Sequence, residues 1–180
     1  MRTTTSMPTF SALAPATHFV LISRFHIAAE PLTVWRALTQ VADWPNWWPA
    51  VAAVERPDAA HEQGSVGAVA VIDWKSPVGY RFRTKATTLH IERPRCIEAR
   101  VEGDLHGHGL WVLEPTDDGV DVTYRWDLEL RRPWMRHWAW LLRPVFAWSH
   151  FRVLRGGVVG LARHLNVRAQ ITAEWVGGPR

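Results

Sequence analysis

One pair of histidines has the spacing of a metal site. His106 and His108 are separated by a single residue, and on a β-strand this spacing places both imidazoles on the same face of the sheet. Two imidazoles side by side can bind zinc, but a protein zinc site has at least three ligands, and no third ligand is evident beside them. We therefore interpret His106 and His108 as a solvated histidine pair, keep a metal site as the minority hypothesis, and expect no metal and no cofactor.

A second unusual feature is a cluster of tryptophans within five positions. Trp44, Trp47 and Trp48 stand in the stretch DWPNWWPA, between Pro45 and Pro49. A tryptophan buries a large apolar area and must also place its indole N–H, so such a cluster suits a lid, the wall of a binding site or a wet interface. We expect a short helix over residues 43 to 50 whose tryptophans are part core and part lid, with core alone as the alternative.

Composition indicates one globular domain. The chain has 180 residues, of which 47% are hydrophobic and 21% charged, which is enough to form a full core without disulfides or a structural metal. Cys96 is the only cysteine, which excludes an internal disulfide and favours a reducing compartment, so we expect a cytoplasmic protein. Residues 1–16 lack the pattern of a signal peptide and are predicted to be a flexible tail.

The positive charge is concentrated near the C-terminus. The formal net charge is +4, and the stretch from Leu130 to Ala173 contains eight arginines and no acidic residue. Residues 131–155 combine arginines with tryptophans, as a segment on a membrane surface does. The alternative is a C-terminal helix that buries its tryptophans against a sheet while the arginines reach water, and we favour it. Binding of this segment to a membrane surface is kept as the second hypothesis.

Hydrophobic periodicity predicts an α+β fold. Alternating apolar residues from Phe19 to Ile27 predict a first strand, and a helix follows over residues 31–39, beginning at Pro31. Turn signals divide residues 51–131 into five or six strands joined as hairpins. A long helix is expected from Pro133 to about Asn166, with a kink at Pro144.

Three hairpin turns, KSPVG, ERPR and EPTDDG, fix predicted registers between neighbouring strands. The registers pair Trp74 with Tyr80, Cys96 with Ile91, Thr88 with Ala99, Ala86 with Val101, and Leu113 with Val120. All of them place apolar residues on one face, and because a one-residue slip would turn every side chain over, this agreement supports the pairing. A bulge is the feature that could break it.

The opposite face is predicted to be a solvated ladder of charges. It pairs Asp73 with Arg81, Lys85 with Glu102, and His106 with Asp127. The basic run of Arg81, Arg83 and Lys85 is interpreted as part of this outer face. A nucleic-acid partner is not favoured, because no recognised binding module accompanies the charge.

Several motifs together resemble the START-like (SRPBCC, helix-grip) superfamily, which includes polyketide cyclases and dehydratases, lipid-transfer domains and plant pathogenesis-related allergens. The motifs are PLTVWRALT (31–39), WPNWWP (44–49), GDLHGHGLW (103–111), VTYRW (122–126), WSH (148–150) and GGVVGL (156–161). The resemblance implies a curved antiparallel sheet of about seven strands that wraps a long C-terminal helix, with two short helices after the first strand. The expected domain spans residues 17–168, followed by a C-terminal tail at 169–180.

The resemblance also implies a deep cavity between the sheet and the C-terminal helix. The residues expected to line it are Trp48, Trp74, Tyr80, Phe82, Thr84, Thr88, His90, Trp111, Tyr124, Trp126 and His150. Gly107 and Gly109 would leave space between the aromatic side chains, and Gly156, Gly157 and Gly160 add little bulk on the helix. The alternative is that the aromatic residues fill a core and the glycines allow strand bending or close helix packing.

The expected function is binding of a hydrophobic small molecule, cyclic or aromatic, by a carrier or sensor. The enzymatic alternative is a polyketide aromatase/cyclase or dehydratase that moves protons through His150 and Tyr124, since no Asp or Glu is predicted on the inward face. His150 is chosen because it resembles a recurring histidine of the superfamily. A lipid carrier that docks on membranes is the second alternative. The sequence indicates no nucleotide site and no oligomeric state.

Overall fold

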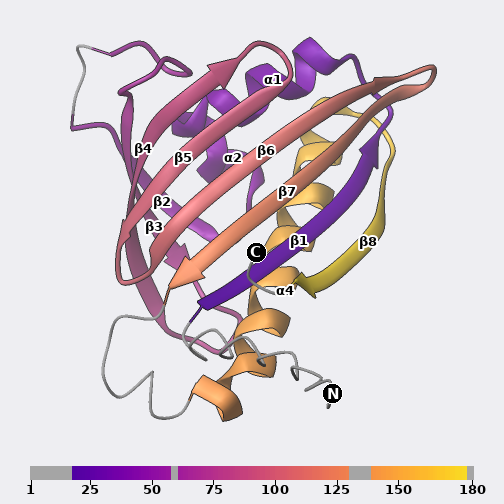
Figure 1. Ribbon diagram of the computed structural model, residues 1–180. Helices are drawn as coiled ribbons and strands as arrows, with labels where there is room; N and C mark the ends of the chain where they lie inside the picture. The colour runs from indigo at the N-terminus through magenta and orange to yellow at the C-terminus, as the bar shows by residue number, and fades with distance from the viewer. Residues whose placement is uncertain (1–17, 58–60, 130–138, 178–180) are drawn as a thin grey trace, which may run out of the picture.

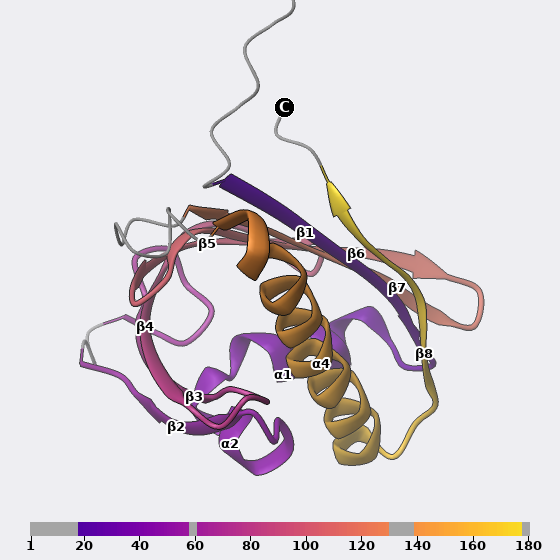
Figure 2. The same ribbon diagram turned by 90° about the horizontal axis from the view of Figure 1, so that it is seen from below.

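The computed structural model describes residues 18–57, 61–129 and 139–177. The tail expected at residues 1–16 and the first part of the arginine- and tryptophan-rich segment lie outside the described residues. Within them, one antiparallel sheet curves around a long helix (Figures 1 and 2). The helix-grip architecture implied by the resemblance is therefore confirmed.

The sheet has eight strands in the order β2-β3-β4-β5-β6-β7-β1-β8. Their bounds are β1 (His18–Ile27), β2 (Val51–Glu55), β3 (Val69–Lys75), β4 (Arg81–Glu92), β5 (Cys96–Gly103), β6 (His106–Thr116), β7 (Gly119–Glu129) and β8 (Ala169–Gly177). The inner face is closed by helices α1 (Pro31–Thr39), α2 (Trp44–Trp47) and α4 (Ala139–Leu165), and a 3-10 turn η1 (Val41–Asp43) joins the first two. Figure 2 shows α4 crossing the concave side of the sheet.

The prediction of a C-terminal tail at 169–180 is wrong for residues 169–177. These residues form β8, which pairs antiparallel with β1. The chain leaves α4 through Asn166, whose positive φ of 54° lets it turn back toward the sheet. Arg155 of α4 forms an ion pair with Glu174 of β8, whose side chain is only 9% exposed. The sheet thus has one strand more than expected.

Two predicted registers keep the correct face but are displaced by two residues. Trp74 pairs with Phe82 rather than Tyr80, because the backbone N–H of Ser76 donates to the carbonyl of Tyr80 and closes the turn later than predicted. Leu113 likewise pairs with Val122 rather than Val120, since a two-residue turn at 117–118 connects β6 and β7.

The third register is confirmed in one half and wrong in the other. Thr88 pairs with Ala99 and Ala86 with Val101 as predicted, but the register shifts between Thr88 and His90. Cys96 therefore pairs with Glu92 instead of Ile91. A bulge adds one residue to a strand and reverses the facing of those beyond it. It leaves His90 exposed.

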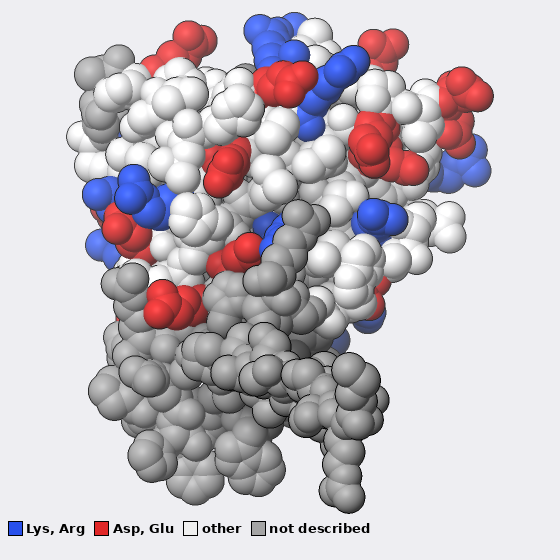
Figure 3. Space-filling model, viewed as in Figure 1, with Lys and Arg blue, Asp and Glu red and all other residues white. Residues whose placement is uncertain are grey.

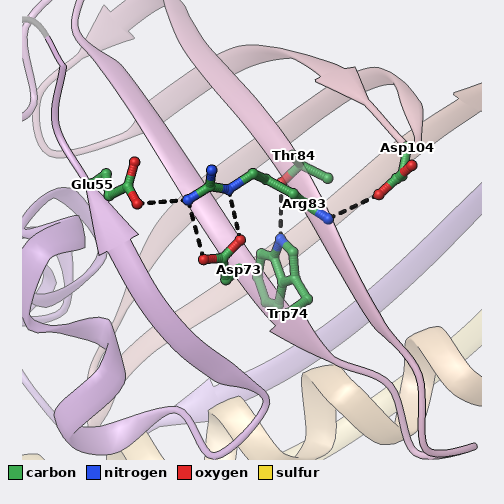
Figure 4. A network of polar contacts seen from close by, with 6 residues as sticks. All are labelled: Glu55, Asp73, Trp74, Arg83, Thr84 and Asp104. Atoms are coloured by element: carbon green, nitrogen blue, oxygen red, sulfur yellow. Dashed lines mark hydrogen bonds and ion pairs between the residues drawn. The ribbon is translucent and has the colours of Figure 1, made fainter.

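The outer face is a charged ladder, as predicted, with changed partners. Figure 3 shows basic and acidic side chains intermingled on this side of the molecule. Asp73 bonds to Arg83 rather than Arg81, at 2.8 Å, and Glu55 accepts a second bond from Arg83 at 2.6 Å (Figure 4). Lys85 lies opposite Glu102 as expected.

The histidine pair lies on this outer face. His106 is opposite Glu129, not Asp127, and His108 is opposite Asp127. Nδ1 of His108 is 3.6 Å from a carboxylate oxygen of Glu98. Among the described residues, no group of three or more His, Cys, Asp or Glu side chains could hold a metal ion.

Candidate ligand-binding cavity

A cavity of about 140 Å³ lies between the inner face of the sheet, α2 and the first half of α4. Nine of the eleven side chains predicted to line such a cavity border it. They are Trp48, Trp74, Tyr80, Phe82, Thr84, Trp111, Tyr124, Trp126 and His150. They come together because alternate residues of β3, β4, β6 and β7 point to the concave side of the sheet. Tyr80, with 46% of its surface exposed, lies at the rim.

Two predicted lining residues lie elsewhere. Thr88 borders a separate cavity of about 80 Å³ near α1, together with Arg56 and Gln63. His90 points outward because of the bulge in β4, so its prediction as an inward residue is wrong. A bulge cannot be located from apolar alternation alone, because Leu89, His90 and Ile91 fit either facing.

Sequence reasoning missed the apolar end of the cavity and most of its helical wall. Leu105 and Leu128 form a small buried cluster, against which Phe146 of α4 packs. The helical wall also includes Val153 and Leu154, beside Ser149 and the predicted His150. Together with Phe146 these positions follow the three- and four-residue spacing of one helix face, which is the signal that could have identified them.

The tryptophan cluster forms core and cavity wall at once. Trp44, Trp47 and Trp48 are 8%, 6% and 4% exposed, and the rings of Trp47 and Trp48 stack with centroids 5.5 Å apart. Trp44 and Trp48 border the cavity, and the indole N–H of Trp48 donates to the carbonyl of Val153 on α4 at 2.9 Å. These contacts fix α2 against α4, and the burial of all three tryptophans favours a fixed wall over the predicted lid.

Gly157 and Gly160 of α4 allow close helix packing, and none of Gly156, Gly157 and Gly160 borders the cavity. A Cβ on Gly157 would lie 2.5 Å from the Trp48 ring, and a Cβ on Gly160 would overlap the carbonyl oxygen of Trp47. For Gly157 and Gly160, the expectation that they leave cavity space is therefore replaced by the alternative, which is close helix packing. On β6, by contrast, Gly109 leaves room beneath a cavity side chain, since its Cβ would lie 3.1 Å from the Tyr124 hydroxyl.

Polar groups are sparse inside the cavity. The indole N–H of Trp74 donates to Oγ1 of Thr84 at 2.8 Å, and Figure 4 shows this pair on the opposite side of the sheet from Arg83 and its carboxylates. Within the described part of the chain, no Asp, Glu, Lys or Arg borders the cavity. The interior therefore offers aromatic contacts and a few neutral hydrogen-bonding groups.

The two titratable candidates, His150 and Tyr124, lie side by side. Their ring centroids are 5.9 Å apart, and Tyr124 also stacks on Trp111 at 4.0 Å. Burial lowers the pKa of His150 to about 3, because desolvation penalises the imidazolium. Burial raises the pKa of Tyr124 for the corresponding reason. Both side chains are consequently neutral near pH 7.

Comparison with known proteins agrees with the fold. The sequence matches the family described as polyketide cyclase/dehydrase and lipid transport over residues 20–166. The chain belongs to this family. The match covers β2 to β7, all but the first two residues of β1, and all of α4.

Solved structures share the architecture at low identity. The di-domain ARO/CYC BexL from the BE-7585A biosynthetic pathway has a TM-score of 0.70 and 16% identity, over 86% of this chain and 52% of that one. A START superfamily protein from Mycobacterium smegmatis has a TM-score of 0.67 and 12% identity, over 82% and 97%. The major latex-like protein 151 of Panax ginseng has a TM-score of 0.62 and 18% identity, over 82% and 97%.

The chain spans about half the length of the di-domain ARO/CYC proteins that it matches. No curated protein gives a significant match to the sequence. Among the described residues, no helix is both long and apolar enough to cross a membrane.

Proposed function

We propose that the protein binds a neutral, apolar molecule of about one ring in the cavity between the sheet and α4, as a carrier or sensor. The observation that carries this proposal is a cavity with aromatic walls and, among the described residues, no charged side chain on its border. Such a lining suits an apolar ligand. Burial of apolar surface against it is favourable, whereas burial of a charge without a counter-charge is unfavourable.

The volume of the cavity supports a small ligand. Sites for drug-sized molecules measure roughly 300–1,000 Å³, whereas this cavity measures about 140 Å³. An apolar cavity of about 150 Å³ is known to bind benzene. A single substituted ring is therefore the expected size, and a polycyclic ligand would require the walls to move apart.

The enzymatic alternative is polyketide cyclisation or dehydration through His150 and Tyr124. Family membership and the similarity to di-domain ARO/CYC proteins favour it. The electrostatics favour binding instead, because an efficient general acid or base has a pKa near the working pH. A His150 pKa of about 3 makes the imidazole a weak base, and the raised pKa of Tyr124 makes its phenol a weak acid.

Native mass spectrometry of freshly purified, tag-free protein tests the proposal. We expect the protein to carry a stoichiometric small-molecule adduct that disappears on denaturation. If the purified protein is empty, we expect an added single-ring hydrocarbon to form such an adduct. Ala99→Leu narrows the cavity from β5 and should abolish binding. Ala53→Leu makes the same change at an exposed position of β2 and should leave binding intact. An adduct that survives Ala99→Leu, or no binding to the native protein, contradicts the proposal.

A second candidate function is exchange of the ligand at an anionic membrane surface. The described half of the arginine- and tryptophan-rich segment does not bury all its apolar residues, since Val145 is 45% and Trp148 49% exposed. The guanidinium of Arg152 lies 5.8 Å from the Trp148 ring centroid. Exposed apolar residues beside arginines are typical of helices that lie on anionic lipid.

Vesicle flotation with phosphatidylserine-containing and neutral vesicles separates this candidate from simple solution binding. Flotation only with anionic vesicles, weakened by Trp148→Ser, supports docking through α4. Tyr80→Ser, which removes an exposed aromatic side chain from the rim of the cavity, is the matched control and should float normally. The absence of flotation with anionic vesicles contradicts the membrane candidate and leaves cavity binding untouched. The cytoplasmic location stays a prediction.

A further inference from the structure

Two buried nitrogen atoms at the same cavity have no hydrogen-bond partner. Nε1 of Trp126 and Nε2 of His150 are enclosed, and neither has a partner among the described residues. Both side chains border the cavity. Since buried polar groups in folded proteins are nearly always paired, two unpaired nitrogens at one cavity indicate a partner from outside the described residues, which a bound ligand can supply.

The two side chains come from opposite walls of the cavity, and their rings lie close together. Trp126 belongs to β7 and His150 to α4, and their ring centroids are 5.1 Å apart with the planes inclined by 31°. Around them, Tyr124 stacks against His150 on one side. Leu105, Leu128 and Phe146 supply apolar surface from the neighbouring cluster. Two unpaired nitrogens surrounded by apolar and aromatic side chains fit a ligand that is apolar except for one small polar group.

The chemistry of the two nitrogens restricts that polar group. An indole N–H can only donate, whereas a neutral imidazole nitrogen either donates or accepts, according to the tautomer. A hydroxyl oxygen can accept from Trp126, and the same hydroxyl can donate to an unprotonated Nε2 or accept from a protonated one. A carboxylate would enter without a counter-charge, because none of the described residues that border the cavity is cationic.

We propose that the cavity recognises a neutral phenol-type ligand, a single aromatic ring whose hydroxyl is bound between Trp126 and His150. This inference rests on the proposed cavity binding and names its ligand class. The ring occupies the aromatic part of the cavity, where Trp111 and Tyr124 stack. The hydroxyl occupies the end where the two unpaired nitrogens lie.

The test compares ligands of nearly equal shape by NMR titration of the native protein. The ligands are 4-methylphenol, p-xylene, in which a methyl group replaces the hydroxyl, and 4-methylbenzoate. We expect 4-methylphenol to bind about tenfold more tightly than p-xylene, as hydrogen bonds to otherwise unpaired groups allow. The Trp126 indole N–H signal, assigned from Trp126→Phe, should move downfield with 4-methylphenol only. The benzoate should bind worst.

The variants Trp126→Phe and His150→Phe should each reduce the preference for 4-methylphenol while retaining p-xylene binding. Trp175→Phe removes an exposed indole N–H from β8, away from the cavity, so it serves as the matched control and should keep the preference. Equal affinity of the native protein for 4-methylphenol and p-xylene would overturn the inference but support cavity binding. If neither ligand binds the native protein, the proposed function itself fails.

Discussion

Replacing Gly160 with alanine tests the contact that holds α4 against α2. A Cβ at this buried position would overlap the backbone carbonyl oxygen of Trp47, and a backbone atom cannot move aside as a side chain end can. Overpacking of this kind costs about 1–3 kcal/mol. Alanine recovers about 0.5–1 kcal/mol of helix propensity over glycine. From the middle of each range, we therefore expect Gly160→Ala to lower the free energy of unfolding by about 1 kcal/mol.

Gly156 provides the matched control on the same helix, one turn earlier. A Cβ there meets no atom within 4 Å, so Gly156→Ala should raise the free energy of unfolding by about 0.5–1 kcal/mol through helix propensity alone. The two identical substitutions are thus expected to have opposite signs.

Urea unfolding, followed by far-UV circular dichroism, measures both changes. For a chain of this length, 1 kcal/mol corresponds to about 2–4 °C in Tm, so thermal unfolding should separate the two variants clearly. If Gly160→Ala is as stable as the native protein, or if both variants shift in the same direction, the close contact between α4 and α2 is wrong.

Three further predictions concern polar groups. Thr84→Val removes the acceptor of the Trp74 indole N–H and should cost about 1–3 kcal/mol, measured by urea unfolding, because a buried donor is left unpaired. Between about pH 6.5 and pH 3 the unfolded chain binds a proton at His150 that the folded chain excludes, so stability should fall as the pH drops, by up to about 1.4 kcal/mol per pH unit. His150→Gln should flatten that dependence. Arg155→Met leaves the nearly buried carboxylate of Glu174 without its partner, so amides of β8 should lose hydrogen-exchange protection while β4 to β7 keep theirs.

Each of these predictions has a clear contrary result. The Trp74–Thr84 hydrogen bond does not stabilise the fold if Thr84→Val has the same urea midpoint of unfolding as the native protein. The lowered pKa of His150 is wrong if the native protein and His150→Gln lose stability in parallel on acidification. Unchanged protection of β8 in Arg155→Met would show that pairing with β1 alone holds the last strand.

The facing of residues could be predicted from the sequence, but the register could not be fixed. Alternation in β3, β4, β6 and β7 assigned Trp74, Phe82, Trp111 and Tyr124 to the inner face correctly. Alternation repeats every two residues, so a turn of the same length centred one residue later displaces the pairing by two residues without changing the face. The displaced registers at both of these hairpins have this cause, whereas the bulge near His90 changed the face itself.

The cavity was harder to predict than the sheet. A glycine on a helix suits an open cavity and a close helix contact equally well, and only the position of Trp47 distinguishes them at Gly160. The volume left between the aromatic rings depends on their packing, which no spacing in the sequence reveals. The unpaired nitrogens of Trp126 and His150 are likewise visible only once β7 and α4 are placed together.

The most direct test of cavity binding is a crystal structure of the protein determined from crystals grown in the presence of 4-methylphenol. We expect one ligand in the cavity beside Trp111 and Tyr124, with its hydroxyl within hydrogen-bonding distance of Trp126 Nε1 and His150 Nε2. A cavity filled by its own aromatic side chains, or a ligand found only on the surface, would contradict the account.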